Sequence, residues 1–192
     1  LIANRSRMNI QYLFHDGDII DDEPIESEWI NADNAYKKLD ETNFPYGILA
    51  GNHDVGHLSG DYSKFSQYFG EDRYSSNPWY GGSYKDNRGH YDLITVDGID
   101  FIMIFTGWGI GDEEIKWMND VLAQYPDRIA ILNFHEYLLA SGGLGEEPQR
   151  VYDEVVSVNP NVRMVLSGHY HNAQTVVSQF DDNGDGENDR NV

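Results

Sequence analysis

The sequence predicts one α/β domain over residues 1–192. Short apolar runs typical of strands alternate along it with segments whose apolar residues recur every three or four positions, as on a helix. Several of the apolar runs end in a cluster of polar residues. A length of 192 residues suits a single domain, and apolar residues, at 40% of the chain, are enough for a packed core.

In the first part of the chain, two strands enclose a helix. The strands are predicted at residues 10–14 and 46–50, and each leads into a polar cluster. Between them, apolar residues spaced four and three apart define one helical face, formed by Ile25, Trp29, Ala32, Tyr36 and Leu39. A short helix then follows, which we expect Asp61 to cap and Gly70 to end.

Residues 70–90 are rich in Gly, Ser, Asn, Tyr and Trp and show little periodicity. We expect a long loop there that faces the substrate or varies between related proteins. Residues 91–96 and 100–105 are strand-like and flank Asp97-Gly98, which is a strong signal for a hairpin turn.

The last part of the chain returns to alternating elements. Helices are expected from Asp112, where acidic residues fill the first turn, and from Pro148. Strands are expected at 129–134, at 162–167 and through Val176 and Phe180, the last of which runs into an Asp-rich tail at 181–192.

Composition narrows the function and the setting. The 33 acidic and 13 basic residues give a net charge of −20, which argues against a nucleic-acid polymer as partner. The absence of cysteine excludes disulfides and thiolate metal sites. No apolar run is long enough for a membrane span. We expect an extracellular or cell-surface protein, with the cytoplasm as the alternative, and a processed or truncated product because the chain starts at Leu1.

Four polar clusters follow predicted strands. In open α/β sheets the carboxyl ends of strands meet at one edge, where ligands bind, so these clusters are expected to converge. They offer carboxylate, amide oxygen and imidazole ligands without sulfur, a set that suits Mn, Fe, Zn or Ni better than Ca. The clusters are Gly17-Asp18-Ile19-Ile20-Asp21, Gly51-Asn52-His53-Asp54, Phe134-His135-Glu136 and Gly168-His169-Tyr170-His171.

In this order the clusters resemble the motifs of the calcineurin-like metallophosphoesterases, G-D-x-x-D, G-N-H-D/E, a single His and G-H-x-H. The first family motif, D-x-H, has no counterpart before Asp18. The resemblance implies a four-layer αββα sandwich of two mixed sheets, here without its first strand. It also implies a dinuclear hydrolase of phosphate mono- or diesters, in which a metal-activated hydroxide attacks phosphorus.

The resemblance assigns roles by position. Asp18 would bridge two divalent metals, one of them completed by Asn52, His135 and His169, and the other bound by His171. Because the first motif would supply the remaining ligands, we expect the chain as given to be a slow enzyme. His53 would act as general acid, oriented by Asp54, while Asp21 and His15 would lie behind the ligands.

Each residue also has a structural explanation. Asp18 and Asn52 suit turns, His135 suits a hydrogen-bonded core position, and the histidines at 169 and 171 suit an exposed loop. Two other functions stay open, a non-catalytic metal-binding scaffold and a calcium-stabilised surface module. Asp22-Glu23 stands where protein phosphatases of the superfamily have Arg-Gly, which favours a small phosphoester.

Further candidates lie outside the motifs. Tyr80, Arg88, His90 and Trp108 are predicted to line a substrate pocket, with a packed aromatic surface as the alternative. His57 and His90 are expected in loops. In the tail, Asp181, Asn183, Asp185 and Asp189 have the spacing of a calcium loop, although Val192 replaces the usual final Glu. The alternative for the tail is a polar hairpin turn between two strands.

Overall fold

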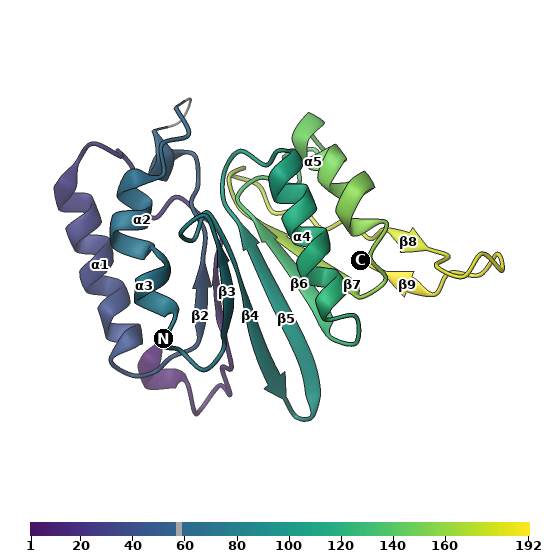
Figure 1. Cartoon of the computed structure of the whole chain (residues 1–192), viewed down its shortest axis with the longest axis horizontal. Helices are drawn as coiled ribbons and strands as arrows, with labels where there is room; N and C mark the ends of the chain where they lie inside the picture. Colours follow the sequence, from purple (N-terminus) through teal and green to yellow (C-terminus); the bar gives the residue numbers. More distant parts are fainter. Residues whose placement is uncertain (57–58) are drawn as a thin grey trace.

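Two β-sheets lie between two groups of helices in the computed structural model, which describes residues 1–56 and 59–192 (Figure 1). The smaller sheet pairs β1 (Leu13–His15) in parallel with β2 (Tyr46–Ile48). The larger sheet has five strands in the order β3-β4-β5-β6-β7. The predicted α/β class is therefore confirmed, and the layers follow the order helices, sheet, sheet, helices.

The larger sheet is mixed. Its strands β3, β4 and β5 are antiparallel neighbours, whereas β5, β6 and β7 run parallel. The turn between β4 and β5 uses Asp97 (φ 49°) and Gly98 (φ 82°), the left-handed pair that a two-residue hairpin requires. The strand bounds are Tyr80–Tyr84 (β3), Gly89–Val96 (β4), Ile99–Thr106 (β5), Ile129–Phe134 (β6) and Val162–Ser167 (β7).

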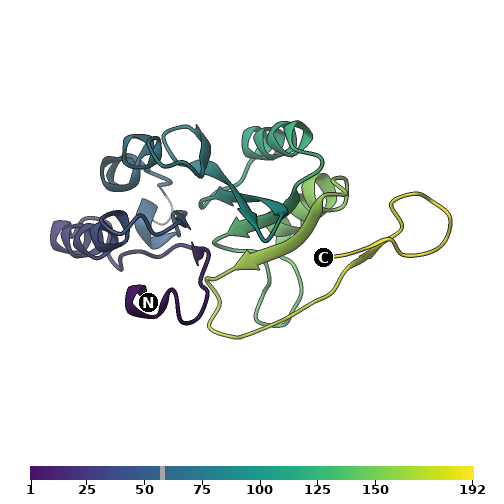
Figure 2. The ribbon, with the colours of Figure 1, turned by 90° about the horizontal axis from the view of Figure 1, so that it is seen from below.

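The helices divide between the two outer layers (Figure 2). One group covers the smaller sheet and consists of α1 (Glu26–Asp40), α2 (Ser63–Phe69) and α3 (Glu71–Tyr74). The other group covers the larger sheet and consists of α4 (Asp112–Gln124) and α5 (Glu146–Val151), which continues as a π-helical turn at Tyr152–Val156. Short 3-10 turns lie at Ile2–Asn4 and His53–Val55. Each helix in the described residues is too short or too polar to cross a bilayer.

Three buried apolar clusters of the described chain fill the spaces between the layers. Trp29, buried on α1, belongs to the cluster under the smaller sheet. Met118 on α4 belongs to the cluster against the larger sheet. Met103 and Phe105 on β5 join Leu49 between the two sheets. Most of each predicted apolar face is buried in one of these spaces, although Ile25 is 43% exposed, so hydrophobic burial accounts for the layering.

The prediction of a long loop at residues 70–90 is wrong. This segment contains α3, β3 and the start of β4. Its glycines serve close packing rather than loop freedom, because a Cβ at Gly81 would lie 2.2 Å from the ring of Tyr91. His90, also expected in a loop, lies on β4 and is buried.

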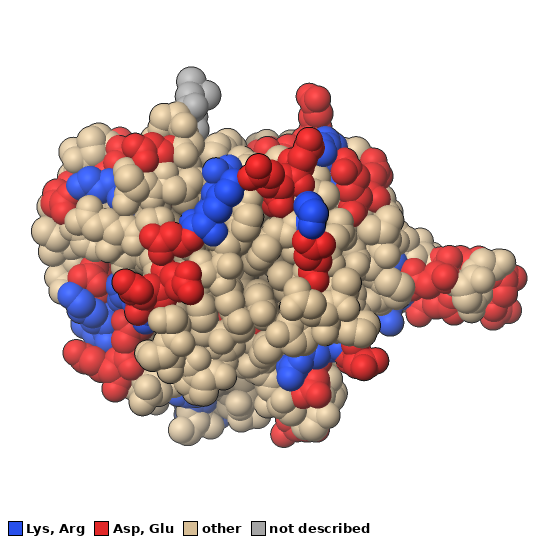
Figure 3. All heavy atoms as spheres, in the orientation of Figure 1, with Lys and Arg blue, Asp and Glu red and all other residues tan. Residues whose placement is uncertain are grey.

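The last predicted strand is shorter than expected. Val176 lies before it and is 46% exposed, and β8 covers only Gln179–Phe180, which pairs antiparallel with β9 (Arg190–Asn191). The Asp-rich segment is thus the turn of a hairpin, as the alternative held. The alternative also had the chain stop after the first strand, which is wrong because β9 is present. The turn carries mostly acidic side chains (Figure 3). Calcium binding by Asp181, Asn183, Asp185 and Asp189 stays a prediction.

The hairpin is fastened to the body by Arg190, whose side chain is fully buried. Its guanidinium makes two bonds of 2.8 Å to the carboxylate of Asp182 and also donates to the carbonyl oxygens of Val156, Ser157 and Val162. The residues beyond the last polar cluster are therefore an ordered part of the fold.

Replacing Arg190 by Met should lower the free energy of unfolding by about 3 kcal/mol, because it leaves Asp182 and the carbonyl oxygens without their donor. Urea unfolding followed by circular dichroism measures this change. Lys38→Met, at an exposed lysine of α1, is the control and should change stability by less than about 0.5 kcal/mol.

The same ion pair predicts an acid dependence of stability. The hydrogen bonds from Arg190 lower the pKa of Asp182, so the stabilisation is present above about pH 4 and is lost as the pH falls further. The difference between the wild type and Arg190→Met should therefore shrink near pH 3. An equal difference at pH 3 and pH 7 would contradict this account.

Candidate metal centre

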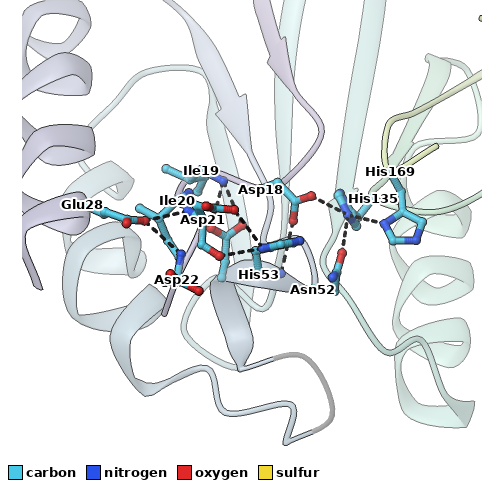
Figure 4. A network of polar contacts seen from close by, with 11 residues as sticks. Asp18, Ile19, Ile20, Asp21, Asp22, Glu28, Asn52, His53, His135 and His169 are labelled. Carbon is cyan, nitrogen blue, oxygen red and sulfur yellow. Dashed lines mark hydrogen bonds and ion pairs between the residues drawn. The ribbon is translucent and has the colours of Figure 1, made fainter. Parts of the chain in front are cut away.

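The four polar clusters converge at one end of the sheets (Figure 4). Asp18 follows β1, Asn52 follows β2, His135 follows β6 and His169 follows β7. These strands pair in parallel within their sheets, so their carboxyl ends open to the same edge. The fold thus brings together residues that are separated by more than a hundred positions in the sequence.

His135 lies at the centre of the cluster and is almost fully buried. Its Nε2 atom is 3.4 Å from a carboxylate oxygen of Asp18, 3.0 Å from Oδ1 of Asn52 and 3.1 Å from Nδ1 of His169. One ligand atom each from Asp18, His135 and His169 lie within 4.8 Å of one another. This is the spacing at which several donors can share one ion.

The other ring nitrogen of His135 fixes which atom faces the cluster. Its Nδ1 lies 2.7 Å from the carbonyl oxygen of Asp16, an acceptor, so Nδ1 carries a proton. In the neutral ring, Nε2 then has the lone pair and points to Asp18, Asn52 and His169. A backbone acceptor behind a histidine is the usual arrangement for a metal ligand.

Burial and neighbouring groups shift the pKa values of the residues in the cluster. Burial, the largest single influence, opposes the charge of Asp18, but the hydrogen bond to His135, the charge of His135 and the N–H of His53 together outweigh it and lower the pKa of Asp18. Burial also opposes protonation of His135, but its bonds to Asp18 and Asp16 raise its pKa. Burial and the charge of His135 together lower the pKa of His169. A carboxylate and a neutral imidazole are the forms that bind metal, and a cation in the cluster would displace the proton from His135.

The backbone around the cluster is strained. Asp18 (φ 54°) and His169 (φ 64°) adopt the left-handed conformation, which costs a non-glycine residue about 1–2 kcal/mol. Glycines permit the close approach, because a Cβ at Gly17 would lie 2.4 Å from Nδ1 of His135 and one at Gly51 would lie 2.2 Å from Oδ1 of Asp18. Such strain concentrates at functional sites.

Asp54 ties the first two clusters together. Its buried carboxylate accepts hydrogen bonds from the backbone N–H groups of Ile19 (2.9 Å), Ile20 (3.0 Å) and Gly51 (2.7 Å). Burial raises the pKa of Asp54 to about 6, partly offset by these donors. The resemblance has Asp54 orient His53, whereas these bonds show it holding the loops that carry Asp18 and Asn52.

Replacing Asp54 by Ala should lower the free energy of unfolding by about 3 kcal/mol or more, since three buried N–H groups lose their acceptor. Thermal unfolding of the metal-free protein measures the loss. Asp120→Ala, at an exposed aspartate of α4, serves as the control and should stay within about 0.5 kcal/mol. Equal stability of the two variants would mean that Asp54 does not hold the loops.

His53 and His171 lie beside the cluster. Nδ1 of His53 is 2.6 Å from the carbonyl oxygen of Asp21 and 3.5 Å from its carboxylate, and the bond to that carbonyl raises the pKa of His53. His53 and His171 both line a cavity that also contains Asp18 and Asp21. The structure therefore places Asp21 against the ring of His53.

The predicted pocket residues have other partners. His90 is 2% exposed and stacks on Phe105 at 4.6 Å, with Tyr80 stacked at 5.8 Å. These two side chains belong to the packed aromatic surface that was the alternative. Arg88 donates to the carbonyl oxygen of Gly109 at 3.0 Å. Trp108 alone of the four lies by the cluster, with its ring 5.3 Å from that of His169.

One further histidine of the described chain, His15, lies near enough to the cluster for Asp18 and His135 to act on its charge. His15 ends β1 and packs its ring edge-on against Tyr36 at 5.9 Å. Burial lowers the pKa of His15, which keeps its ring neutral. His57 lies outside the described residues.

Residues 2–173 match the family model described as calcineurin-like phosphoesterase. The chain belongs to this family. The matched region includes all four polar clusters and ends before the β8–β9 hairpin. The family assignment confirms the resemblance.

A curated relative of this chain is "Uncharacterized protein YvnB" of Bacillus subtilis (strain 168). The two sequences are 55% identical over 189 residues, which is 98% of this chain and 15% of that protein. The chain thus corresponds to one small part of a much longer relative, and the activity of such a longer protein is a matter for proposal.

Sequence reasoning missed two contributors to this phosphoesterase site. The carbonyl group of Asp16 orients His135, but a backbone acceptor leaves no trace in residue type. Glu28, in the first turn of α1, accepts hydrogen bonds from the backbone N–H groups of Asp21 and Asp22 and lines the cavity. Glu28 lies seven residues after Asp21, at the start of a predicted helix, and this position was the only sign in the sequence that it could bind the loop of Asp21.

Proposed function

We propose that the chain hydrolyses small phosphate mono- or diesters with two divalent metals, drawn from Mn, Fe, Zn or Ni. The observation that carries this proposal is the convergence of Asp18, Asn52, His135 and His169 around one point. Oxygen and imidazole donors at these distances fit such an ion, and the left-handed backbone at Asp18 and His169 shows that the fold holds them at a cost.

The ligands would divide between the two metals as follows. Asn52, His135 and His169 would hold one ion together with Asp18, and Asp18 and His171 would contribute to the other. When bound, the metals would supply a Lewis acid for the phosphoryl group and an activated water. They would also provide the positive charge that a protein of net charge −20 otherwise lacks.

The chain's own residues would supply the proton for the leaving group and hold the metal ligands in position. The carbonyl oxygen of Asp21 holds the Nδ1 proton of His53, so the protonated ring presents its second proton on Nε2. That proton would pass to the oxygen of the departing alcohol. Asp54 holds the loops of Asp18 and Asn52 at a fixed separation, and His135 keeps its lone pair on Nε2 through Asp16.

Hydrolysis of p-nitrophenyl phosphate and bis-p-nitrophenyl phosphate tests the proposal, with the purified chain assayed in Mn²⁺, Fe²⁺, Zn²⁺ or Ni²⁺ and in chelator. We expect slow turnover of at least one ester that depends on metal. A chain that binds metal and hydrolyses neither ester would instead be the metal-binding scaffold that the sequence left open.

A further inference from the structure

A cavity of about 720 Å³ extends from the metal centre to helix α1. Asp18, His53 and His171 line its inner part, which belongs to the proposed reaction site. Its outer wall comes from the loop at Asp21 and from the face of α1 that carries Glu28, Asn31 and Ala32. In the proposed hydrolysis the α1 wall acts only indirectly, through the hydrogen bonds of Glu28 to the loop of Asp21, so we expect it to face the part of the substrate that does not react.

The outer wall is negatively charged. Among the described residues that line the cavity none is Lys or Arg. Glu28 brings a carboxylate to the outer wall, whereas the carboxylate of Asp21 lies 3.5 Å from Nδ1 of His53. Nearby cations have other partners. Lys64 pairs with Glu26, and Arg88 lies 3.3 Å from Glu114.

Glu28 is held in place by the loop that it faces (Figure 4). Its Oε2 atom accepts hydrogen bonds from the N–H groups of Asp21 at 2.8 Å and Asp22 at 2.9 Å. These donors lower the pKa of Glu28, so its side chain is a carboxylate at neutral pH. Both bonds use the same oxygen, which leaves Oε1 for a ligand in the cavity.

The two ends of the cavity thus favour opposite charges. A phosphoryl group suits the metal end, but a second phosphate or a carboxylate on the organic part would meet Glu28 and Asp21. We propose, on the basis of the proposed hydrolase function, that the organic part of the substrate carries a positively charged ammonium group that lies beside Glu28. Choline- and ethanolamine-type alcohols have this chemistry.

The test compares probes that differ in one charge. The purified chain in Mn²⁺ is assayed with p-nitrophenyl phosphorylcholine and with its neutral carbon isostere, p-nitrophenyl 3,3-dimethylbutyl phosphate. The monoester pair is phosphocholine and 3,3-dimethylbutyl phosphate. Opposite charges about 4 Å apart attract by about 1 kcal/mol even in water, so we expect kcat/KM to favour the cationic probe by about 5- to 10-fold. High salt should reduce this preference.

Variants locate the source of the preference. Glu28→Gln should bring the ratio of the two kcat/KM values close to one. Glu41→Gln makes the same charge change just beyond the far end of α1, outside the cavity lining, and should keep the wild-type ratio. The comparison of the two probes in the wild-type chain needs no variant, so it stands even where Glu28→Gln disturbs the loop.

The outcomes separate this inference from the proposed function. Turnover of both probes at equal rates, or a preference that Glu28→Gln leaves unchanged, would overturn the ammonium site while the hydrolase function stands. Failure to hydrolyse these probes, p-nitrophenyl phosphate and bis-p-nitrophenyl phosphate in any metal would overturn the function and this inference with it.

Discussion

Replacing His135 by Gln is expected to remove metal binding and phosphoester hydrolysis together. The Nε2 atom of His135 lies within 3.4 Å of Asp18, Asn52 and His169, so this side chain is in reach of every other proposed ligand of the first metal. Loss of a residue that merely supports a ligand typically weakens metal affinity 10- to 100-fold. Loss of this central ligand should exceed about 100-fold, as measured by titration calorimetry with Mn²⁺.

The control for this variant is the neighbouring His15→Gln. The ring of His15 packs on Tyr36 and makes no hydrogen bond to the ligands among the described residues, although Asp18 and His135 act on its charge, so metal affinity should fall far less than in His135→Gln. Unfolding of the metal-free variants separates a loss of binding from a loss of fold. Wild-type affinity in folded His135→Gln would show that the ion binds elsewhere.

Replacing His53 by Gln is expected to lower kcat by about 10²- to 10⁴-fold, the usual contribution of a general acid. Metal affinity should hardly change, because His53 approaches the cluster through its backbone, whose N–H donates to Asp18 at 3.2 Å. The two variants should therefore lose activity for different reasons. His135→Gln should lose the metal, whereas His53→Gln should keep the metal and lose the proton donor.

Substrates with different leaving groups sharpen this test. p-Nitrophenol leaves readily without a proton, whereas an alkyl alcohol needs one. The loss in His53→Gln should therefore be larger for an alkyl phosphate than for p-nitrophenyl phosphate. A loss of equal size with both esters, or a parallel loss of metal, would show that His53 has another role.

The sequence predicted that the four polar clusters converge, because each of them follows a strand. An apolar run that ends in Gly and a polar residue records where the chain leaves the sheet, and parallel strands bring such ends together. Asp18, Asn52, His135 and His169 lie in one cluster for this reason. What they bind still rests on the proposal.

The errors arose where one residue type serves two purposes. Gly81 and Gly82 suggested a loop, but they make room for the ring of Tyr91 within a sheet. His90 and Tyr80 suggested a polar pocket, but aromatic rings on both faces of His90 bury it. Val176 suggested a strand because it is apolar, although it is 46% exposed before β8.

Long-range polar contacts were also out of reach. The backbone N–H groups of Ile19 and Ile20 donate hydrogen bonds to the carboxylate of Asp54, which lies 35 and 34 positions further along the chain. The donors are backbone groups, not side chains. Their pattern depends on the final geometry of two loops. Arg190 is a similar case, because a basic residue near the end of an acidic tail gives no sign that it is buried.

The metal content of the purified chain measures directly whether the cluster of Asp18, Asn52, His135 and His169 binds an ion. The wild-type chain and His135→Gln would be stripped with chelator, loaded in parallel with Mn²⁺, dialysed and analysed by plasma mass spectrometry. We expect at least one Mn ion per wild-type chain and almost none in the variant. A wild-type chain that keeps no metal after loading, or a folded variant that keeps as much as the wild type, would contradict this expectation.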